Sequence, residues 1–211
     1  MHHLLPAVLL SIALLDTGSL QAQEFEGLIT VHMTGTTRDG TQIPDVEYMS
    51  RKGMVRLNVR SPMGSIGVIA IPAEKKLYAL MDAQSAYMEQ PLSFDIAATT
   101  PAPVVTRTGK KETIAGYECE HILIAGQPGS MDVCMARGLG PFVAATVALG
   151  GQSMPAWQRA LLADGGFPLK VIRADGTTQL EVTKIEKKRL SDALFTVPDN
   201  YTKMDMPRRR P

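Results

Sequence analysis

The sequence predicts a mainly β (α+β) protein with about 10–11 antiparallel strands and one helical insertion. Short segments that alternate apolar and polar residues, separated by turn residues, fill both ends of the chain and are typical of antiparallel sheet. Asp175-Gly176, between two such segments, is a strong hairpin-turn signal. Only residues 138–163 show helical patterns instead. These three observations define the predicted fold class.

Six strands are predicted in the first half of the chain. In one of them Val55, Leu57 and Val59 alternate with polar residues, which indicates one buried face and one solvated face. Residues 97–103, AATTPAP, predict a surface crossing, because their prolines suit neither a helix nor a central strand. The six expected strands are Phe25–Met33, Val46–Ser50, Met54–Arg60, Ile66–Ile71, Leu77–Met81 and Ala86–Glu89.

The second half predicts further strands that flank the helical insertion. They are a strand near Val105, then Tyr117–Ala125, Ser130–Ala136, Leu169–Ala174 and Thr177–Ile185.

The insertion predicts two helices, Phe142–Leu149 and Pro155–Leu162. The first is apolar nearly all round, which predicts that it is buried or lies over a cavity. Glycines at both of its ends suit a segment that moves as a lid. The candidate residues for contact with an apolar ligand are Phe142, Val143, Val147, Leu149 and Trp157.

The N-terminus predicts export. Leu4–Leu15 is an apolar run of signal-peptide length, shorter than the roughly 20 residues that span a bilayer. We expect residues 1–22 to be a signal peptide cleaved after Ala22, and no cysteine follows to carry a lipid anchor. The expected organisation is then a single domain over residues 23–202 and a basic disordered tail over residues 203–211. The expected location is the periplasm or the medium, with no integral membrane segment after cleavage.

Composition excludes several classes of function. Removing Asp16 with the signal leaves 22 basic and 20 acidic side chains (21 minus 1), so there is no electrostatic reason to expect nucleic acid as a partner. His32 and His121, the histidines outside the signal, lie in ordinary strand alternation. Gly64-Ser65-Ile66-Gly67 does not match the nucleophile elbow of hydrolases. We therefore predict neither an enzyme nor a cofactor.

Cys119 and Cys134 lie on the two strands that flank the turn at residues 126–129. A symmetric turn would place them opposite each other, close enough to bridge, and an oxidising compartment favours the bond. The alternatives are two free buried thiols, or a metal site formed by Cys119, His121 and Cys134. Three scattered ligands are weaker than paired Cys-x-x-Cys motifs, so the prediction is a disulfide and no metal.

Three stretches resemble the motifs of a bacterial exported family known only as a domain of unknown function, DUF4412. They are GKKETIAGYECEH (109–121), GFPLKVIRADG (166–176) and LSDALFTVPDNY (190–201), in the same order and spacing as in the family. The family resembles the periplasmic lipoprotein carriers known as LolA and LolB. That resemblance implies an antiparallel, unclosed, barrel-like curved sheet with helices covering its concave face. It brings no assigned activity.

Two functional hypotheses follow. The first is a non-catalytic periplasmic protein that binds or carries a lipid or another apolar ligand between a half-barrel and its helices. The alternative is an envelope interaction or structural module without a small-molecule ligand. A large apolar cavity under residues 138–163 would favour the first, and a filled core there would favour the second.

Overall fold

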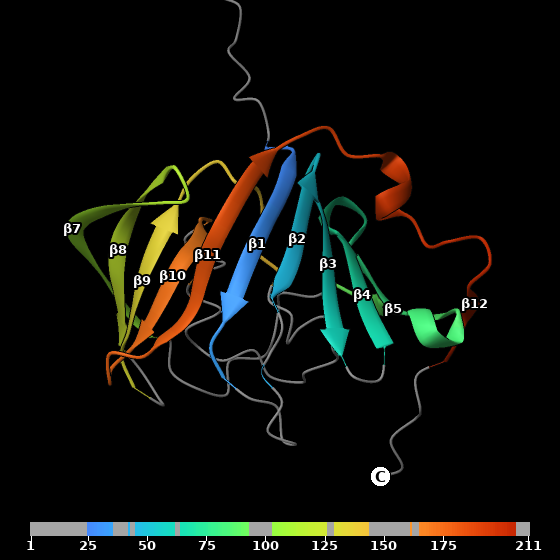
Figure 1. Ribbon diagram of the computed structural model, residues 1–211, viewed down its shortest axis with the longest axis horizontal. Coiled ribbons are helices and arrows are strands. Elements are labelled where there is room, and N and C mark those ends of the chain that lie inside the picture. Colours follow the sequence, from blue (N-terminus) through green and yellow to red (C-terminus); the bar gives the residue numbers. More distant parts are fainter. Residues whose placement is uncertain are drawn as a thin grey trace, which may run out of the picture.

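The computed structural model describes residues 25–35, 42, 45–61, 64–92, 103–125, 129–143, 161 and 165–205. They form a single curved sheet of twelve strands, which Figure 1 shows as an arch that does not close. Along the sheet the strand order is β12-β6-β5-β4-β3-β2-β1-β11-β10-β9-β8-β7. The prediction of a mainly antiparallel, unclosed, curved sheet is thereby confirmed, with slightly more strands than expected.

The sheet consists of two antiparallel meanders that meet where β1 pairs with β11. The first meander contains β1 (Gly27–Met33), β2 (Val46–Arg51), β3 (Met54–Ser61), β4 (Gly64–Ile71), β5 (Lys76–Met81) and β6 (Ala86–Pro91). The second contains β7 (Val104–Ile114), β8 (Tyr117–Ala125), β9 (Met131–Ala136), β10 (Phe167–Arg173) and β11 (Thr178–Lys187). The short β12 (Thr202–Lys203) pairs in parallel with β6.

Three 3-10 helices of three or four residues complete the described elements: η1 (Pro72–Glu74), η2 (Asp82–Gln84) and η3 (Asp192–Phe195). Each of the first two continues a strand through a tight turn that ends in the left-handed conformation, at Lys75 and Ser85. None of the helices in the described part of the chain is long and apolar enough to cross a membrane.

Most of the larger hydrophobic core lies on one side of the sheet, which we call the inner face. Residues of distant strands gather in it, among them Ile29, Leu57 and Val133. Leu92, Leu139, Val143 and Leu161 join this core from outside the strands. Because strands so far apart in the sheet share one cluster, the inner face is the concave one. Twist and curvature of a large open sheet produce this shape.

A second hydrophobic cluster covers the opposite, outer face of β1–β6. Met49, Ile69 and Leu80 point to this side, because each alternates with inner-face residues of its strand. The chain after β11 packs against them through Leu190 and Phe195. The C-terminal segment, residues 188–205, is therefore part of the folded domain, and β12 adds a short strand at the edge.

The expected start of the helical insertion is wrong. Residues 138–143 are described and are not helical. Gly138 and Gly140 have φ of +79° and +85°, the left-handed region that interrupts a right-handed helix. The apolar composition of residues 142–149 suggested a helix that begins at Phe142, but Phe142 and Val143 are not helical in the described part of the chain. Residues 144–160 and 162–164 lie outside the described residues.

Residues 1–24 and 206–211, which contain the expected signal peptide and most of the expected basic tail, also lie outside the described residues.

Candidate functional site

The first candidate site is the place where residues 137–143 cross the inner face. Tyr48, on β2, is fully buried among apolar side chains and its hydroxyl contacts this segment twice. It donates a hydrogen bond to the Pro141 carbonyl and accepts one from the Val143 amide at 2.9 Å. Burial raises the pKa of Tyr48 well above its ordinary value, while the bond from Val143 opposes that shift. The hydroxyl is therefore held as a neutral donor and acceptor.

Aromatic packing reinforces the same contact. The Tyr48 ring meets Phe167 edge-on at 5.0 Å between ring centroids, and Phe142 meets Phe167 in the same way at 5.4 Å. Edge-to-face pairs at this separation stabilise beyond their buried area, typically by about 0.5–1.5 kcal/mol. Phe142 is thus held by β2 and β10 together.

Ser50 lies two residues after Tyr48 and on the same face of β2. Its side chain is buried, and its hydroxyl has no hydrogen-bond partner in the described part of the chain. Gly140 approaches so closely that a Cβ there would come within 2.5 Å of the Ser50 Oγ. An unpaired hydroxyl in a buried position costs about 1–3 kcal/mol, which makes Ser50 a position that a polar ligand group would stabilise.

Of the five predicted ligand-contact residues, the structure describes two. Phe142 is partly buried against the inner core and Val143 is buried in it. Val147, Leu149 and Trp157 lie outside the described residues. Sequence reasoning missed Tyr48 and Ser50, although their alternation with Glu47 and Met49 would have placed both polar groups on the buried face of that strand.

The second candidate site surrounds the two cysteines. Cys119 and Cys134 form the predicted disulfide, with 5.3 Å between their Cα atoms. The register differs from the expected one, because His121 and not Cys119 lies opposite Cys134. The bridge is therefore diagonal between β8 and β9. The pairing of the two strands is shifted by two residues relative to the expected one, and this shift brings His121 beside the sulfur atoms.

His121 is almost fully buried and lies between two carboxylates. Its Nδ1 is 2.7 Å from Asp132 and its Nε2 is 3.1 Å from Glu112. Lys170, which lies opposite Cys134 on β10, places its Nζ 3.6 Å from both Glu112 and Glu181. These groups share the outer face of the second meander, since their neighbours Ile122, Val133 and Val171 point into the inner core.

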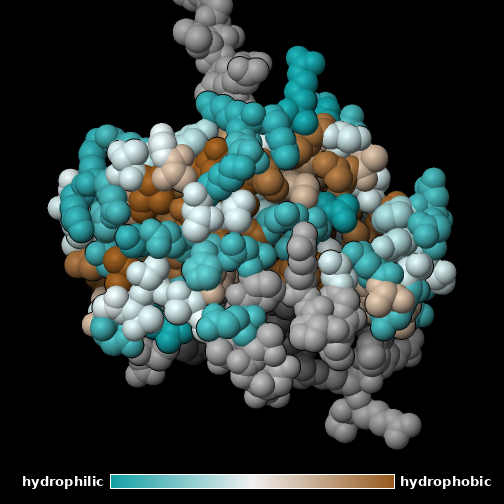
Figure 2. Space-filling model, in the orientation of Figure 1, coloured by the Kyte–Doolittle hydropathy of each residue, from teal (hydrophilic) through white to brown (hydrophobic). Residues whose placement is uncertain are grey.

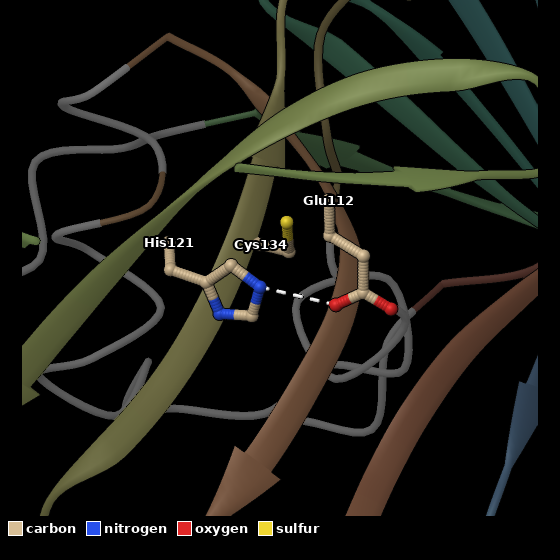
Figure 3. Close-up of side chains that lie close together, drawn as sticks. All are labelled: Glu112, His121 and Cys134. Atoms are coloured by element: carbon tan, nitrogen blue, oxygen red, sulfur yellow. Dashed lines mark hydrogen bonds and ion pairs between the residues drawn. The ribbon is translucent and has the colours of Figure 1, made fainter. Parts of the chain in front are cut away.

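The charges of this cluster are coupled. Desolvation acts to raise the pKa of Glu112, but the hydrogen bond from His121 and the charge of Lys170 outweigh it and hold that pKa below its usual value. Glu112 is thus an ionised acceptor for the His121 ring. Figure 3 shows the His121 ring and the Glu112 carboxylate directed at each other, with the Cys134 sulfur beside them.

The sequence analysis had named His121 among the potential ligands of a metal but had not found Glu112, Asp132 or Lys170. Each comes from a different strand, and only the pairing of β7, β8, β9 and β10 brings them together.

Arg56, on β3, is oriented toward the C-terminal segment, where its Nη1 donates to the Leu194 carbonyl at 2.9 Å.

These features define a class of protein: an open, curved antiparallel sheet with an apolar concave face, crossed by residues 137–143, and an internal disulfide. The chain belongs to the family described as domain of unknown function DUF4412, whose model matches residues 25–201. The family resemblance seen in the three sequence motifs is thereby confirmed. Among curated proteins, none matches this sequence.

A solved structure shares the fold. The chain is similar to an uncharacterized conserved protein from Thermus thermophilus, with a TM-score of 0.51 and 11% identity over 87% of this chain and 93% of that one. It also resembles PNGF-II in two crystal forms, each with a TM-score of 0.49 and with 15% and 18% identity. Those matches cover 86% and 87% of this chain but 31% and 32% of PNGF-II. Likeness at these levels concerns the fold alone.

Proposed function

We propose that this chain is an exported, non-catalytic protein that binds an amphipathic lipid or a similar apolar ligand at the inner face of its sheet. The observation that carries the proposal is the buried, unpaired hydroxyl of Ser50 in an otherwise apolar face of the described residues. A ligand with an apolar body and one polar end would satisfy both the hydroxyl and its surroundings. Periplasmic lipoprotein carriers have the architecture that the sequence motifs suggested.

Access to Ser50 requires residues 140–143 to move, because Gly140 lies directly against the Ser50 hydroxyl. The two hydrogen bonds of Tyr48 hold that segment in place. In this mechanism the Tyr48 hydroxyl holds residues 141–143 closed over the site, which we call the latch, and the Ser50 hydroxyl binds the polar end of the ligand. Phe142 and Val143 would contact its apolar part, together with Val147, Leu149 and Trp157.

Export is the second part of the proposal. The apolar run at Leu4–Leu15 supports it, and so does the disulfide, since such bonds persist in oxidising compartments. N-terminal sequencing of protein recovered outside the cytoplasm should find a chain that begins at or near Gln23. Retention of Met1 on that protein would contradict the proposed cleavage.

A fluorescent fatty-acid probe tests the binding proposal. Ser50→Ala should weaken binding of the fatty acid several-fold and leave binding of a neutral hydrocarbon probe unchanged. Tyr48→Phe should have the opposite effect and speed the association of both probes, because the latch is lost while the ring is kept. Native mass spectrometry of the protein purified from its own compartment should find bound lipid.

The alternative function, an envelope interaction module without a small ligand, has one observation in its favour. Strand β7 forms one end of the sheet, and Val104 and Val105 on it are 66% and 41% exposed. Exposed apolar residues on an edge strand are a surface for strand addition. This alternative predicts that the protein self-associates in sedimentation equilibrium and that Val105→Lys abolishes the self-association. If this is found, and if neither probe binds the natural chain, the alternative replaces the carrier proposal.

A further inference from the structure

We propose that, before its disulfide forms, this chain binds one thiophilic divalent cation such as Zn²⁺ through Cys119, Cys134, His121 and Glu112. The proposal is independent of ligand binding at the inner face. One ligand atom each from Glu112, His121 and Cys134 already lie within 4.8 Å of one another. Cys119 adds the second sulfur, which the disulfide places next to that of Cys134.

The donor set suits zinc. Zinc sites in proteins use cysteine sulfur at about 2.3 Å, histidine nitrogen at about 2.0–2.1 Å and carboxylate oxygen at about 2.0–2.2 Å, in a tetrahedral arrangement. Such bond lengths separate neighbouring ligand atoms by about 3.3–3.8 Å. The 3.1 Å between His121 Nε2 and Glu112 is close to that arrangement, and the Cys134 sulfur lies within 4.8 Å of both. The two sulfurs have to separate once the bridge is reduced.

Asp132 orients the histidine for this role. It accepts a hydrogen bond from His121 Nδ1 at 2.7 Å, which leaves Nε2 directed at Glu112. Histidines that ligate metals usually donate their other ring N–H to a carboxylate in this way, and the partner fixes the tautomer and the ring orientation. Asp132, the second carboxylate beside His121, is therefore a positioning residue that orients the His121 ring.

The charges of the ligands are partly compensated. Two thiolates and the Glu112 carboxylate carry three negative charges, and a divalent cation neutralises two of them. Lys170 lies opposite Cys134 and adds a positive charge 3.6 Å from both Glu112 and Glu181, while Asp132 adds a further carboxylate beside His121. Such pairing lowers the cost of burying charged groups.

Metal binding and the disulfide are alternative states of the same two sulfurs. In the reduced chain each thiol loses its proton when the cation binds, so binding releases two protons. Oxidation by an external disulfide removes two electrons, joins the two sulfurs and frees the cation, while the oxidant becomes a dithiol. Bound cation should therefore delay closure of the bridge in the newly made chain.

Titration of the full-length protein with Zn²⁺, against a chromophoric chelator, tests the proposal. Protein reduced with a water-soluble phosphine should bind one equivalent, and oxidised protein should bind at least 100-fold more weakly. Co²⁺ in place of Zn²⁺ should give the visible bands of a tetrahedral site and a thiolate charge-transfer band. Added Zn²⁺ should also slow the loss of free thiols during reoxidation.

Matched variants identify the ligands. The double variant Cys119→Ser/Cys134→Ser lacks the bridge, like the reduced protein, and keeps all four histidines, so any binding that it retains does not need the two cysteine sulfurs. Glu112→Gln and His121→Gln should each weaken binding at least tenfold, while His32→Gln on β1 should not change it. Far-UV circular dichroism checks that each variant is folded. The proposal is overturned if the reduced protein binds no better than the double serine variant, or if folded Glu112→Gln binds as tightly as the natural chain.

Discussion

The outer face of the sheet has two halves that differ although they share the same strand alternation. On β1–β6 the outward residues include the buried Met49, Ile69 and Leu80, and the C-terminal segment packs against them through Leu190 and Phe195. On β7–β11 the outward residues include Glu112, Lys170 and Glu181 around the disulfide. Figure 2 shows hydrophilic residues over much of one side of the molecule, with separate hydrophobic patches.

This difference shows that a single face of a sheet can use two means of stabilisation. Where a later segment of the chain returns, burial of apolar area stabilises the fold in proportion to that area. Where no described segment covers the outer face, the disulfide and charged hydrogen bonds stabilise that half of the sheet instead. The next four predictions test the comparison, and they run from the largest expected effect to the smallest.

Phe195 is the largest side chain that the C-terminal segment buries against the first half. Phe195→Ala should reduce the free energy of unfolding by about 3–5 kcal/mol, because it removes a buried ring and leaves a cavity. Urea denaturation measures the loss. A change below about 1 kcal/mol, the size of an ordinary surface substitution, would mean that the segment contributes little to the covered half.

Two leucines on the outer face form a matched pair. Leu80 is fully buried under the C-terminal segment, whereas Leu123 on the other half is 42% exposed. Leu80→Ala should cost about 2–5 kcal/mol, and Leu123→Ala should cost less than about 1 kcal/mol. Equal losses in urea denaturation would contradict the comparison between the halves.

The disulfide closes a loop between residues 15 apart. Cys119→Ser/Cys134→Ser should lower the free energy of unfolding by about 3 kcal/mol at most, mainly because the unfolded chain gains freedom. Thiol titration of unreduced protein should find no free thiol in the natural chain. Equal stability of the variant and the oxidised protein would show that the charged hydrogen bonds alone hold this half.

The smallest effect concerns β12 at the edge of the first half. Lys203 lies 2.7 Å from Glu89, and its hydrogen bond and charge lower the pKa of Glu89 below its usual value. A carboxyl with a lowered pKa in the folded protein stabilises it above its unfolded pKa, and this contribution disappears as the pH falls through the folded value.

Stability curves from acid to neutral pH test this sign. The difference between the natural chain and Glu89→Gln should be present near neutral pH and vanish in acid. Lys203→Met should give the same pH dependence as Glu89→Gln. A difference that persists below the folded pKa would show that the Glu89→Gln substitution disturbs the packing and that the ion pair is not the cause.

Sequence reasoning reached the sheet because alternation is a local property. In strands such as Met54–Ser61 and Tyr117–Ala125, successive residues point to opposite faces of the sheet, so the sequence itself shows which residues share a face. In the same way the two cysteines could be placed across one hairpin. The apolar run beginning at Phe142 was harder to interpret. It carries no clear period, so its sequence does not show where a helix would begin, and the structure finds Phe142 and Val143 outside a helix.

The sequence by itself determined the antiparallel sheet, the family and the disulfide, since each depends on neighbouring residues or on recognisable motifs. Only the tertiary structure decided that the C-terminal segment covers one half of the outer face, and that Tyr48 holds residues 141–143. It also decided the grouping of Glu112, His121 and Lys170. Such contacts join residues from 9 to 138 positions apart. They depend on strand order and on a two-residue shift of register, which no local pattern encodes.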